Sequence, residues 1–197
     1  MNVNIDNMGP DQDTYLLSIK KGFELWCCEN TLYDKLKILF EGKEILKNKK
    51  LSFPDFNMFP DFRVPSKNLV IEFNGYRHFT VCKDAYRDIL KRNILKREKI
   101  NLIEIPHFVQ LSLSVVQFLF KNYTNNIVDL SMGYPHGFIH PKSGCIGDYC
   151  TIGLEYVKNI LKDFPFEVKE ECFKSLEIRS KLDNVPINVY NPLSYLE

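Results

Sequence analysis

Apolar residues recur at the spacing of three to four positions that is typical of an amphipathic helix in five stretches of the chain. These stretches are residues 14–28, 31–41, 82–98, 113–120 and 151–163. Thr31 and Asp34 resemble a capping box at the start of the second stretch, and Gly42 is expected to end it. The third stretch predicts an apolar stripe of Tyr86, Ile89, Leu90 and Ile94, with Lys83, Arg87 and Lys91 on another side.

Short runs of β-type residues lie between these helices. The runs DFRV (61–64) and LVIEF (69–73) are separated by the turn-forming tetrapeptide PSKN and predict a hairpin. The run INLIEIP (100–106) predicts a buried strand that Pro106 ends, whereas the proline-rich segment 51–62 disfavours a regular central strand. The order of elements predicts an α/β fold with a small mixed sheet flanked by helices.

Composition divides the chain into three parts. Residues 1–13 read as a flexible polar arm, residues 14–124 as the core, and residues 125–197 as a C-terminal appendage packed on that core. The appendage opens with a loop rich in Gly, Pro, His and Cys, which is where the composition changes.

Composition and charge narrow the function classes. The chain has 197 residues, of which 45% are hydrophobic and 26% charged, as in a globular protein. No apolar run approaches the ~20 residues of a membrane span, and the first residues contain no signal-like stretch, so we expect an intracellular protein, in the cytoplasm or an equivalent compartment, with reduced cysteines and no membrane partner. Because the net charge is only +1, binding to nucleic acid by overall charge alone is disfavoured.

Two acidic residues of the predicted hairpin face each other. With the turn centred between Ser66 and Lys67, Asp61 lies opposite Glu72, and opposed residues point to the same face. Two like charges at that spacing repel unless a cation or a base relieves them. Carboxylates that converge from different elements are what Mg²⁺ or Mn²⁺ needs, so the pair is a candidate metal site, with a solvated surface pair as the alternative.

The hairpin and the segments that follow it resemble a known protein family. The run PDFRVPSKNLVIEFNGYRHF, followed by a basic helix and INLIEIPHF, resembles the PD-(D/E)XK (restriction-endonuclease-like) core of very-short-patch-repair nucleases, related small bacterial nuclease-like domains and RAP domains. The resemblance covers about residues 31–111. It implies a metal-dependent endonuclease that uses Mg²⁺ or Mn²⁺ on DNA or RNA.

The resemblance also assigns roles. Asp61 matches the acid of the first strand, Glu72 the acid of the second, and His78 the histidine just beyond; Asp34 matches the upstream helix acid, and Lys91 is a migrated counterpart of the motif lysine. Asn74 departs from the pattern, because it stands where the motif has Lys and close relatives have Asp. Simpler roles stay open: a helix cap for Asp34, a turn residue for His78 and a solvated face position for Lys91.

Basic and aromatic residues near this hairpin are candidate contacts to nucleic acid. The candidates for phosphate contact are Arg77, Lys83, Arg87, Arg92 and Lys96, and Tyr76 and Phe79 are candidates for stacking on unpaired bases. The simpler alternatives are a solvated helix face and, for Phe79, a place in the core.

Four further residues form a possible zinc set. His136, His140, Cys145 and Cys150 provide four ligand atoms within 15 residues, enough for a tetrahedral structural zinc, although their spacing matches no standard finger. Independent loop positions are the alternative.

Two functions from different classes follow. The first is a divergent metal-dependent nuclease. It is favoured by the presence of Asp61, Glu72 and His78 in one short segment. The second is a nuclease-fold module that binds nucleic acid or a protein partner without cutting, which Asn74 and the small net charge favour.

Overall fold

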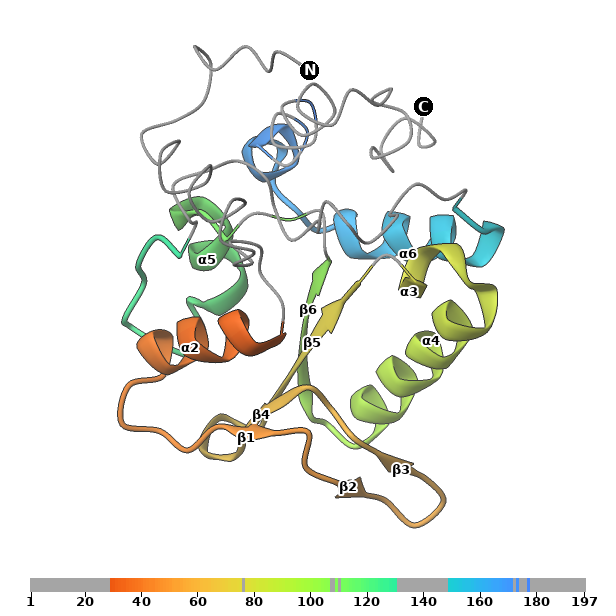
Figure 1. Ribbon diagram of the computed structural model, residues 1–197, viewed down its shortest axis with the longest axis horizontal. Coiled ribbons are helices and arrows are strands. Elements are labelled where there is room, and N and C mark those ends of the chain that lie inside the picture. Colours follow the sequence, from red (N-terminus) through yellow and green to blue (C-terminus); the bar gives the residue numbers. More distant parts are fainter. Residues whose placement is uncertain are drawn as a thin grey trace, which may run out of the picture.

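The computed structural model describes residues 29–75, 77–106, 109, 111–130, 149–171, 173 and 177. The predicted arm and the predicted helix 14–28 lie outside them. Within the described residues the fold is mixed α/β, with a small mixed sheet flanked by helices, as the sequence predicts (Figure 1).

The main sheet has four strands in the order β1-β4-β5-β6. They are β1 (Leu46–Lys47), β4 (Phe62–Val64), β5 (Leu69–Asn74) and β6 (Asn101–Pro106). The pairs β1–β4 and β4–β5 are antiparallel and the pair β5–β6 is parallel. The proline-rich segment forms only a small separate ribbon, β2 (Leu51–Ser52) and β3 (Asn57–Met58).

Helices cover the sheet on both sides (Figure 1). The helices α2 (Glu29–Leu39) and α5 (Leu113–Phe120) lie on one side, and α4 (Cys82–Arg97) lies on the other. The short helix α3 (Arg77–Thr80) and α6 (Thr151–Leu161) lie near the carboxyl ends of β5 and β6. The helix predicted for residues 151–163 is therefore confirmed to within two residues.

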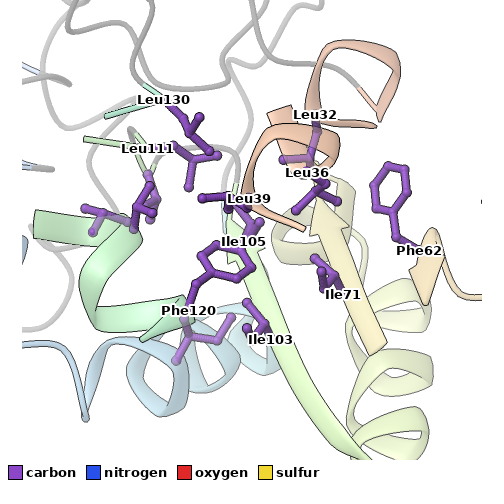
Figure 2. Packing of buried hydrophobic residues seen from close by; sticks show 14 of the residues in the cluster. Leu32, Leu36, Leu39, Phe62, Ile71, Ile103, Ile105, Leu111, Phe120 and Leu130 are labelled. Carbon is purple, nitrogen blue, oxygen red and sulfur yellow. The ribbon is translucent and has the colours of Figure 1, made fainter. Parts of the chain in front are cut away.

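The hydrophobic core fills the space between the sheet and the pair α2 and α5 (Figure 2). Leu32, Leu36 and Leu39 of α2 pack there against Ile71 of β5, and all four side chains are almost fully buried. Each such side chain contributes about 1.5–3 kcal/mol by leaving water. The core fixes α2 over the sheet and leaves the opposite face of β5 for α4.

The hairpin register agrees with the sequence prediction. Phe62 pairs with Ile71 and Val64 with Leu69, so the position opposite Asp61 is Glu72. The connection is a 3₁₀ turn, Pro65–Lys67, followed by Asn68 in the left-handed region with φ 47°. Asparagine tolerates that conformation better than most residues, which explains how PSKN holds the register.

Two details of the predicted helices were wrong. Thr31 lies inside α2, which begins at Glu29, and so does not cap it. In α4, Tyr86 and Leu90 are 63% and 41% exposed, whereas Ala85, Asp88 and Leu95 are buried. The reason is that α4 packs over a face of the sheet that carries Glu72, so its inward side is partly polar.

Helix α6 belongs to the same hydrophobic cluster as the sheet. Tyr156, Val157 and Leu161 are buried in it together with Ile103 and Ile105 of β6. The division at residue 124 stays a prediction. No helix in the described ranges is long and apolar enough to cross a membrane.

Candidate functional site

The acid pair lies where β4 begins and β5 approaches its end. Asp61 comes directly before β4, and its Oδ2 accepts a hydrogen bond from the backbone N–H of Phe73 at 2.7 Å. This bond fixes the Asp61 carboxyl group beside the strand that carries Glu72. The start of β4 and the end of β5 thus bring the carboxyl groups of Asp61 and Glu72 to the same part of the sheet.

Burial dominates the electrostatics of both acids. It raises the pKa of Asp61, against the opposing hydrogen bond from Phe73. It raises the pKa of Glu72 to about 7, even though the nearby Lys91 acts to lower it. The Glu72 side chain is therefore near its midpoint of ionisation at neutral pH, unlike a surface glutamate.

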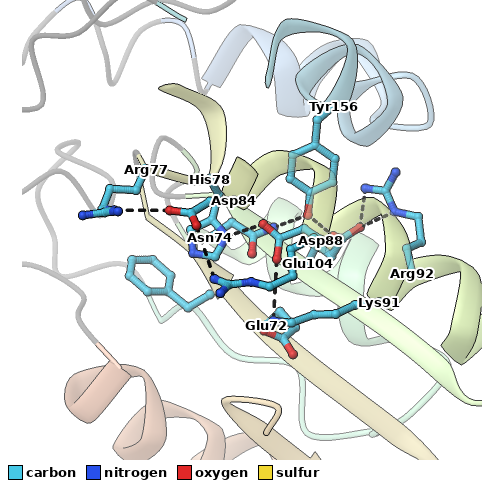
Figure 3. A network of polar contacts seen from close by, with 12 residues as sticks. Glu72, Asn74, Arg77, His78, Asp84, Asp88, Lys91, Arg92, Glu104 and Tyr156 are labelled. Carbon is cyan, nitrogen blue, oxygen red and sulfur yellow. Dashed lines mark hydrogen bonds and ion pairs between the residues drawn. The ribbon is translucent and has the colours of Figure 1, made fainter. Parts of the chain in front are cut away.

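Lys91 extends from the inward side of α4 to this pair (Figure 3). Its Nζ lies 3.1 Å from Oε2 of Glu72 and 3.6 Å from Oδ1 of Asp88. Burial acts to lower the pKa of Lys91, but the carboxylates of Glu72 and Asp88 raise it overall, which keeps the ammonium charged. The sequence interpretation of Lys91 as a solvated position is thereby wrong, since its side chain is only 16% exposed.

The second oxygen of Glu72 has no partner. Among the buried side-chain oxygen and nitrogen atoms of the described residues, Oε1 of Glu72 is the one without a hydrogen bond. A buried carboxyl oxygen without a partner costs about 1–3 kcal/mol, so it calls for a ligand such as a cation or an ordered water.

His78 stands on α3, just after β5. Its Nδ1 lies 2.5 Å from Oδ2 of Asp88, a buried carboxylate on the inward side of α4 (Figure 3). His78 is one of the groups whose charge acts on Asp61. Asp88 thus links His78 to Lys91, Lys91 links to Glu72, and Asp61 lies near enough for Lys91 and His78 to influence its pKa.

The acid of α2 that acts on this site is Glu29 and not Asp34. Asp34 lies on the exposed side of the helix and pairs with Lys37 at 2.6 Å. The Glu29 carboxylate, in the first turn of α2, adds to the rise in the pKa of Asp61, after burial as the main cause. Asn48 donates a hydrogen bond to Glu29 Oε2 at 3.3 Å.

Asn74 takes part in a different network, which reaches α6 (Figure 3). Its Nδ2 donates to the Tyr156 hydroxyl at 2.7 Å, and that hydroxyl donates to Glu104 of β6. Arg92 of α4 donates to Oε2 of Glu104 through Nε at 2.9 Å and through Nη2 at 2.6 Å. Burial, followed by the charge of Glu104, raises the pKa of Tyr156 far above its ordinary range, so the hydroxyl stays protonated.

The candidate phosphate contacts differ in their availability. Arg77 and Arg87 are exposed and both pair with Asp84, at 3.3 and 3.5 Å. Lys83 and Lys96 are exposed, but Arg92 is turned inward to Glu104 and lies over the ring of Tyr156. Three exposed basic residues, Arg77, Lys83 and Arg87, therefore gather at the N-terminal part of α4 and the adjoining α3.

The two stacking candidates have separate outcomes. Phe79 is fully buried and stacks on Tyr156 with ring centroids 5.4 Å apart, so it belongs to the core and is unavailable to a base. Tyr76 lies outside the described residues.

Sets of metal ligands are sparse in the described ranges. The described residues contain no group of three or more His, Cys, Asp or Glu side chains that could hold a metal ion. Of the zinc set, His136, His140 and Cys145 lie outside these ranges. Cys150 caps the N-terminus of α6, where its Sγ accepts from the N–H of Gly153 at 3.2 Å.

Sequence reasoning missed Asp88 and Glu29. Asp88 shares a helical stripe with Ala85, Lys91, Arg92 and Leu95, and a small residue and a leucine flanking charged ones were the available signal that this side faces inward. For Glu29 there was no comparable signal, because its approach to Asp61 depends on how α2 packs.

Comparison with known proteins adds no relative: no family model, no curated protein and no solved structure matches the chain.

Proposed function

We propose that this protein is a metal-dependent nuclease with a restriction-endonuclease-like core, which hydrolyses phosphodiester bonds in DNA or RNA. The observation that carries the proposal is the unpartnered Oε1 of Glu72, buried in a hairpin that also presents Asp61. A carboxyl oxygen in that position is a ready ligand for a hard cation.

The residues present fit Mg²⁺ or Mn²⁺. Asp61 and Glu72 would hold the ion, and two carboxylates suffice because Mg²⁺ commonly completes its shell with waters and substrate phosphate oxygens. When bound, the ion would activate a water and neutralise charge on the phosphate. A cation would also remove the repulsion between the two acids, to which Asp61 contributes by raising the pKa of Glu72.

The other residues serve the phosphate and the attacking water. The Lys91 ammonium, held by Glu72, stabilises the negative charge that develops on phosphorus-bound oxygens. His78 accepts or orients the proton of the attacking water. The exposed Arg77, Lys83 and Arg87 position the nucleic-acid backbone without reading its sequence.

One observation favours the second function, a nuclease-fold module that binds nucleic acid or a protein without cutting. Asn74, at the position of the motif lysine, is engaged by Tyr156 and points toward α6. Catalysis then depends on Lys91 to supply the missing ammonium. The two functions differ in whether removal of a carboxylate changes cleavage or only binding.

Cleavage tests the proposal directly. We would incubate labelled single- and double-stranded DNA and RNA with Mn²⁺ and compare the wild type with Glu72→Gln and with Asp55→Asn, an exposed acid of the β2–β3 loop. We expect cutting by the wild type and by Asp55→Asn, and a loss of at least about 100-fold in Glu72→Gln, because a metal ligand is removed. Equal cutting by all three would indicate a contaminating nuclease, and no cutting with binding intact would favour the binding module.

Metal binding can be measured without substrate. A ligand that binds only the folded state at 100 times its dissociation constant adds about 2.7 kcal/mol of stability, so Mn²⁺ should raise the melting temperature. We expect Asp61→Asn to abolish that rise and Lys83→Met, on the exposed side of α4, to preserve it. An unchanged rise in Asp61→Asn would show that the metal binds elsewhere.

A further inference from the structure

The hydrogen bond between His78 and Asp88 determines the protonation pattern of the imidazole. A carboxylate only accepts hydrogen bonds, so the ring nitrogen that faces it must carry the hydrogen. The nitrogen at 2.5 Å from Asp88 Oδ2 is Nδ1. In the neutral ring, Nε2 is then the unprotonated nitrogen and an acceptor.

Asp88 is fixed in place by its surroundings. It is 4% exposed on the inward side of α4, and its other oxygen, Oδ1, lies 3.6 Å from the ammonium of Lys91. Lys91 forms an ion pair in turn with Glu72. The charge of Asp88 is one of the smaller causes that raise the pKa of Glu72 and of Tyr156. A carboxylate that is buried and paired on both oxygens holds its partner ring in one orientation (Figure 3).

The far nitrogen of the ring is available. Within the described part of the chain, Nε2 of His78 makes no hydrogen bond, and the His78 side chain is 22% exposed. The His78 ring also lies near enough to Asp61 to influence the pKa of that carboxyl group. A water at the outer edge of the neutral ring would meet an acceptor nitrogen.

We propose that Asp88 is a positioning residue, which holds His78 in the Nδ1–H form so that Nε2 takes the proton of the water that attacks the phosphodiester. This inference rests on the proposed nuclease function. In the step, the water oxygen forms a bond to phosphorus as its proton passes to Nε2. The bond from phosphorus to the leaving oxygen breaks, its electron pair stays on that oxygen, and solvent supplies the proton that the oxygen takes up.

The simplest competing role for Asp88 is structural, a tie between α3 and α4. A structural tie predicts that its loss lowers stability, but it makes no prediction about the ring nitrogens or about the split between kcat and KM. The test must therefore read the tautomer itself.

The experiment is ¹⁵N NMR of the histidine rings in the 197-residue chain, which has four histidines, with His78 assigned by His78→Gln. We expect the Nδ1–H form at His78 in the wild type and a shift toward Nε2–H in Asp88→Asn, whose amide NH₂ donates to Nδ1. Asp55→Asn, a matched substitution far along the chain in the β2–β3 loop, should leave the His78 signals unchanged. An Nε2–H ring in the wild type overturns the inference, whether or not any variant folds.

Kinetics complete the test. We expect Asp88→Asn to lower kcat by about 100-fold or more, the usual size of a general-base contribution, with KM changed by less than about threefold. Thermal unfolding of the same samples checks that the variant is folded at the assay temperature. A folded Asp88→Asn with unchanged kcat overturns the inference while the nuclease function stands. If the wild type cuts no substrate, the proposed function itself fails, while the tautomer measurement still decides the arrangement of His78 and Asp88.

Discussion

Glu72 is a carboxyl group in a place where its charged form is unfavourable. It is 5% exposed, one oxygen is bonded to Lys91, and the other has no partner among the residues that the structure describes. Its pKa of about 7 expresses the balance, in which the cost of burial exceeds the attraction of Lys91. In the protein without metal, ionised Glu72 therefore weakens the folded state.

This balance predicts how stability depends on pH. The pKa of Glu72 is raised on folding, so the protonated carboxyl group favours the folded state. Its contribution to the free energy of unfolding is fully present below the ordinary pKa of 4.5 and is lost as pH rises through about 7. Between about pH 5 and about pH 8, metal-free wild type should lose on the order of 2–3 kcal/mol relative to Glu72→Gln, which cannot ionise. Urea unfolding of both proteins across this range measures the difference.

The same experiment contains its own control. Mn²⁺ added at about pH 8 should restore stability to the wild type and leave Glu72→Gln unchanged, because only the wild type gains a ligand for the buried charge. Parallel pH profiles for the two proteins would contradict the explanation based on burial.

At the scale of elements, the contact between α6 and α3 is unusually close. The backbone N–H of Cys150 donates to the carbonyl oxygen of Phe79 at 3.1 Å. A Cβ atom on Gly153 would overlap the backbone carbonyl group of Phe79, which cannot move aside as a flexible side chain can. Glycine at this position lets α6 approach the segment that carries His78.

Gly153→Ala should therefore destabilise the protein by about 1–3 kcal/mol, since the clash forces α6 away from α3. Gly75→Ala is the matched control, because a Cβ at Gly75 has no atom of the described residues within 4 Å, and we expect a change within about 0.5 kcal/mol. Denaturant midpoints of the two variants measure the contrast. Equal midpoints would mean that α6 docks with more freedom than this contact allows.

The elements also show what the sequence could predict. The hairpin was predictable in type and register because PSKN joins two β-type runs of clear pattern, and β6 because a buried aliphatic run ends at proline. The rotation of α4 about its axis was not predictable. Asp88 is buried with a cationic partner and Tyr86 is exposed, whereas aspartate is usually exposed and tyrosine usually at least partly buried. The strands β1 to β3 have two residues each, too few for any period to appear.

The site was predictable to a similar extent. Asp61 and Glu72 followed from local register, which depends on residues close in sequence. Asp88, Glu29 and the network of Tyr156 depend on contacts between segments far apart in the chain, and spacing carries no information about these.

At the scale of the whole molecule, the segment after residue 124 shares the core of the segment before it. Thr124, at the boundary, and Asn126, beyond it, donate side-chain hydrogen bonds to the backbone of α2, at Leu39 and Ile38. Farther on, Tyr156, Val157, Ile160 and Leu161 bury their side chains in the same cluster as the sheet. Four such side chains, at about 1.5–3 kcal/mol each, are comparable to the 5–15 kcal/mol that stabilises a whole domain.

A chain that ends at residue 124 should therefore lose cooperative folding. We expect it to unfold without a sharp thermal transition and to bind a hydrophobic dye, because β6 loses the cover of α6. Val157→Ala in the untruncated 197-residue chain removes two methyl groups from the same cluster, and it should lower the midpoint and keep the transition sharp. A truncated chain with a sharp transition would show instead that residues up to 124 are an independent domain.

The bond between Asn74 and Tyr156 limits which descendants of this sequence are accessible by single mutations. A lysine at position 74 would have to fit an ammonium where an amide, 1% exposed, now meets the Tyr156 hydroxyl. Replacing Lys91 first would leave Glu72 and Asp88 without their cation. Neither order of substitution passes through an intermediate in which each buried charge keeps its partner. Positions 74 and 91 are therefore coupled by epistasis, and both changes would have to arrive together with a new partner for Tyr156.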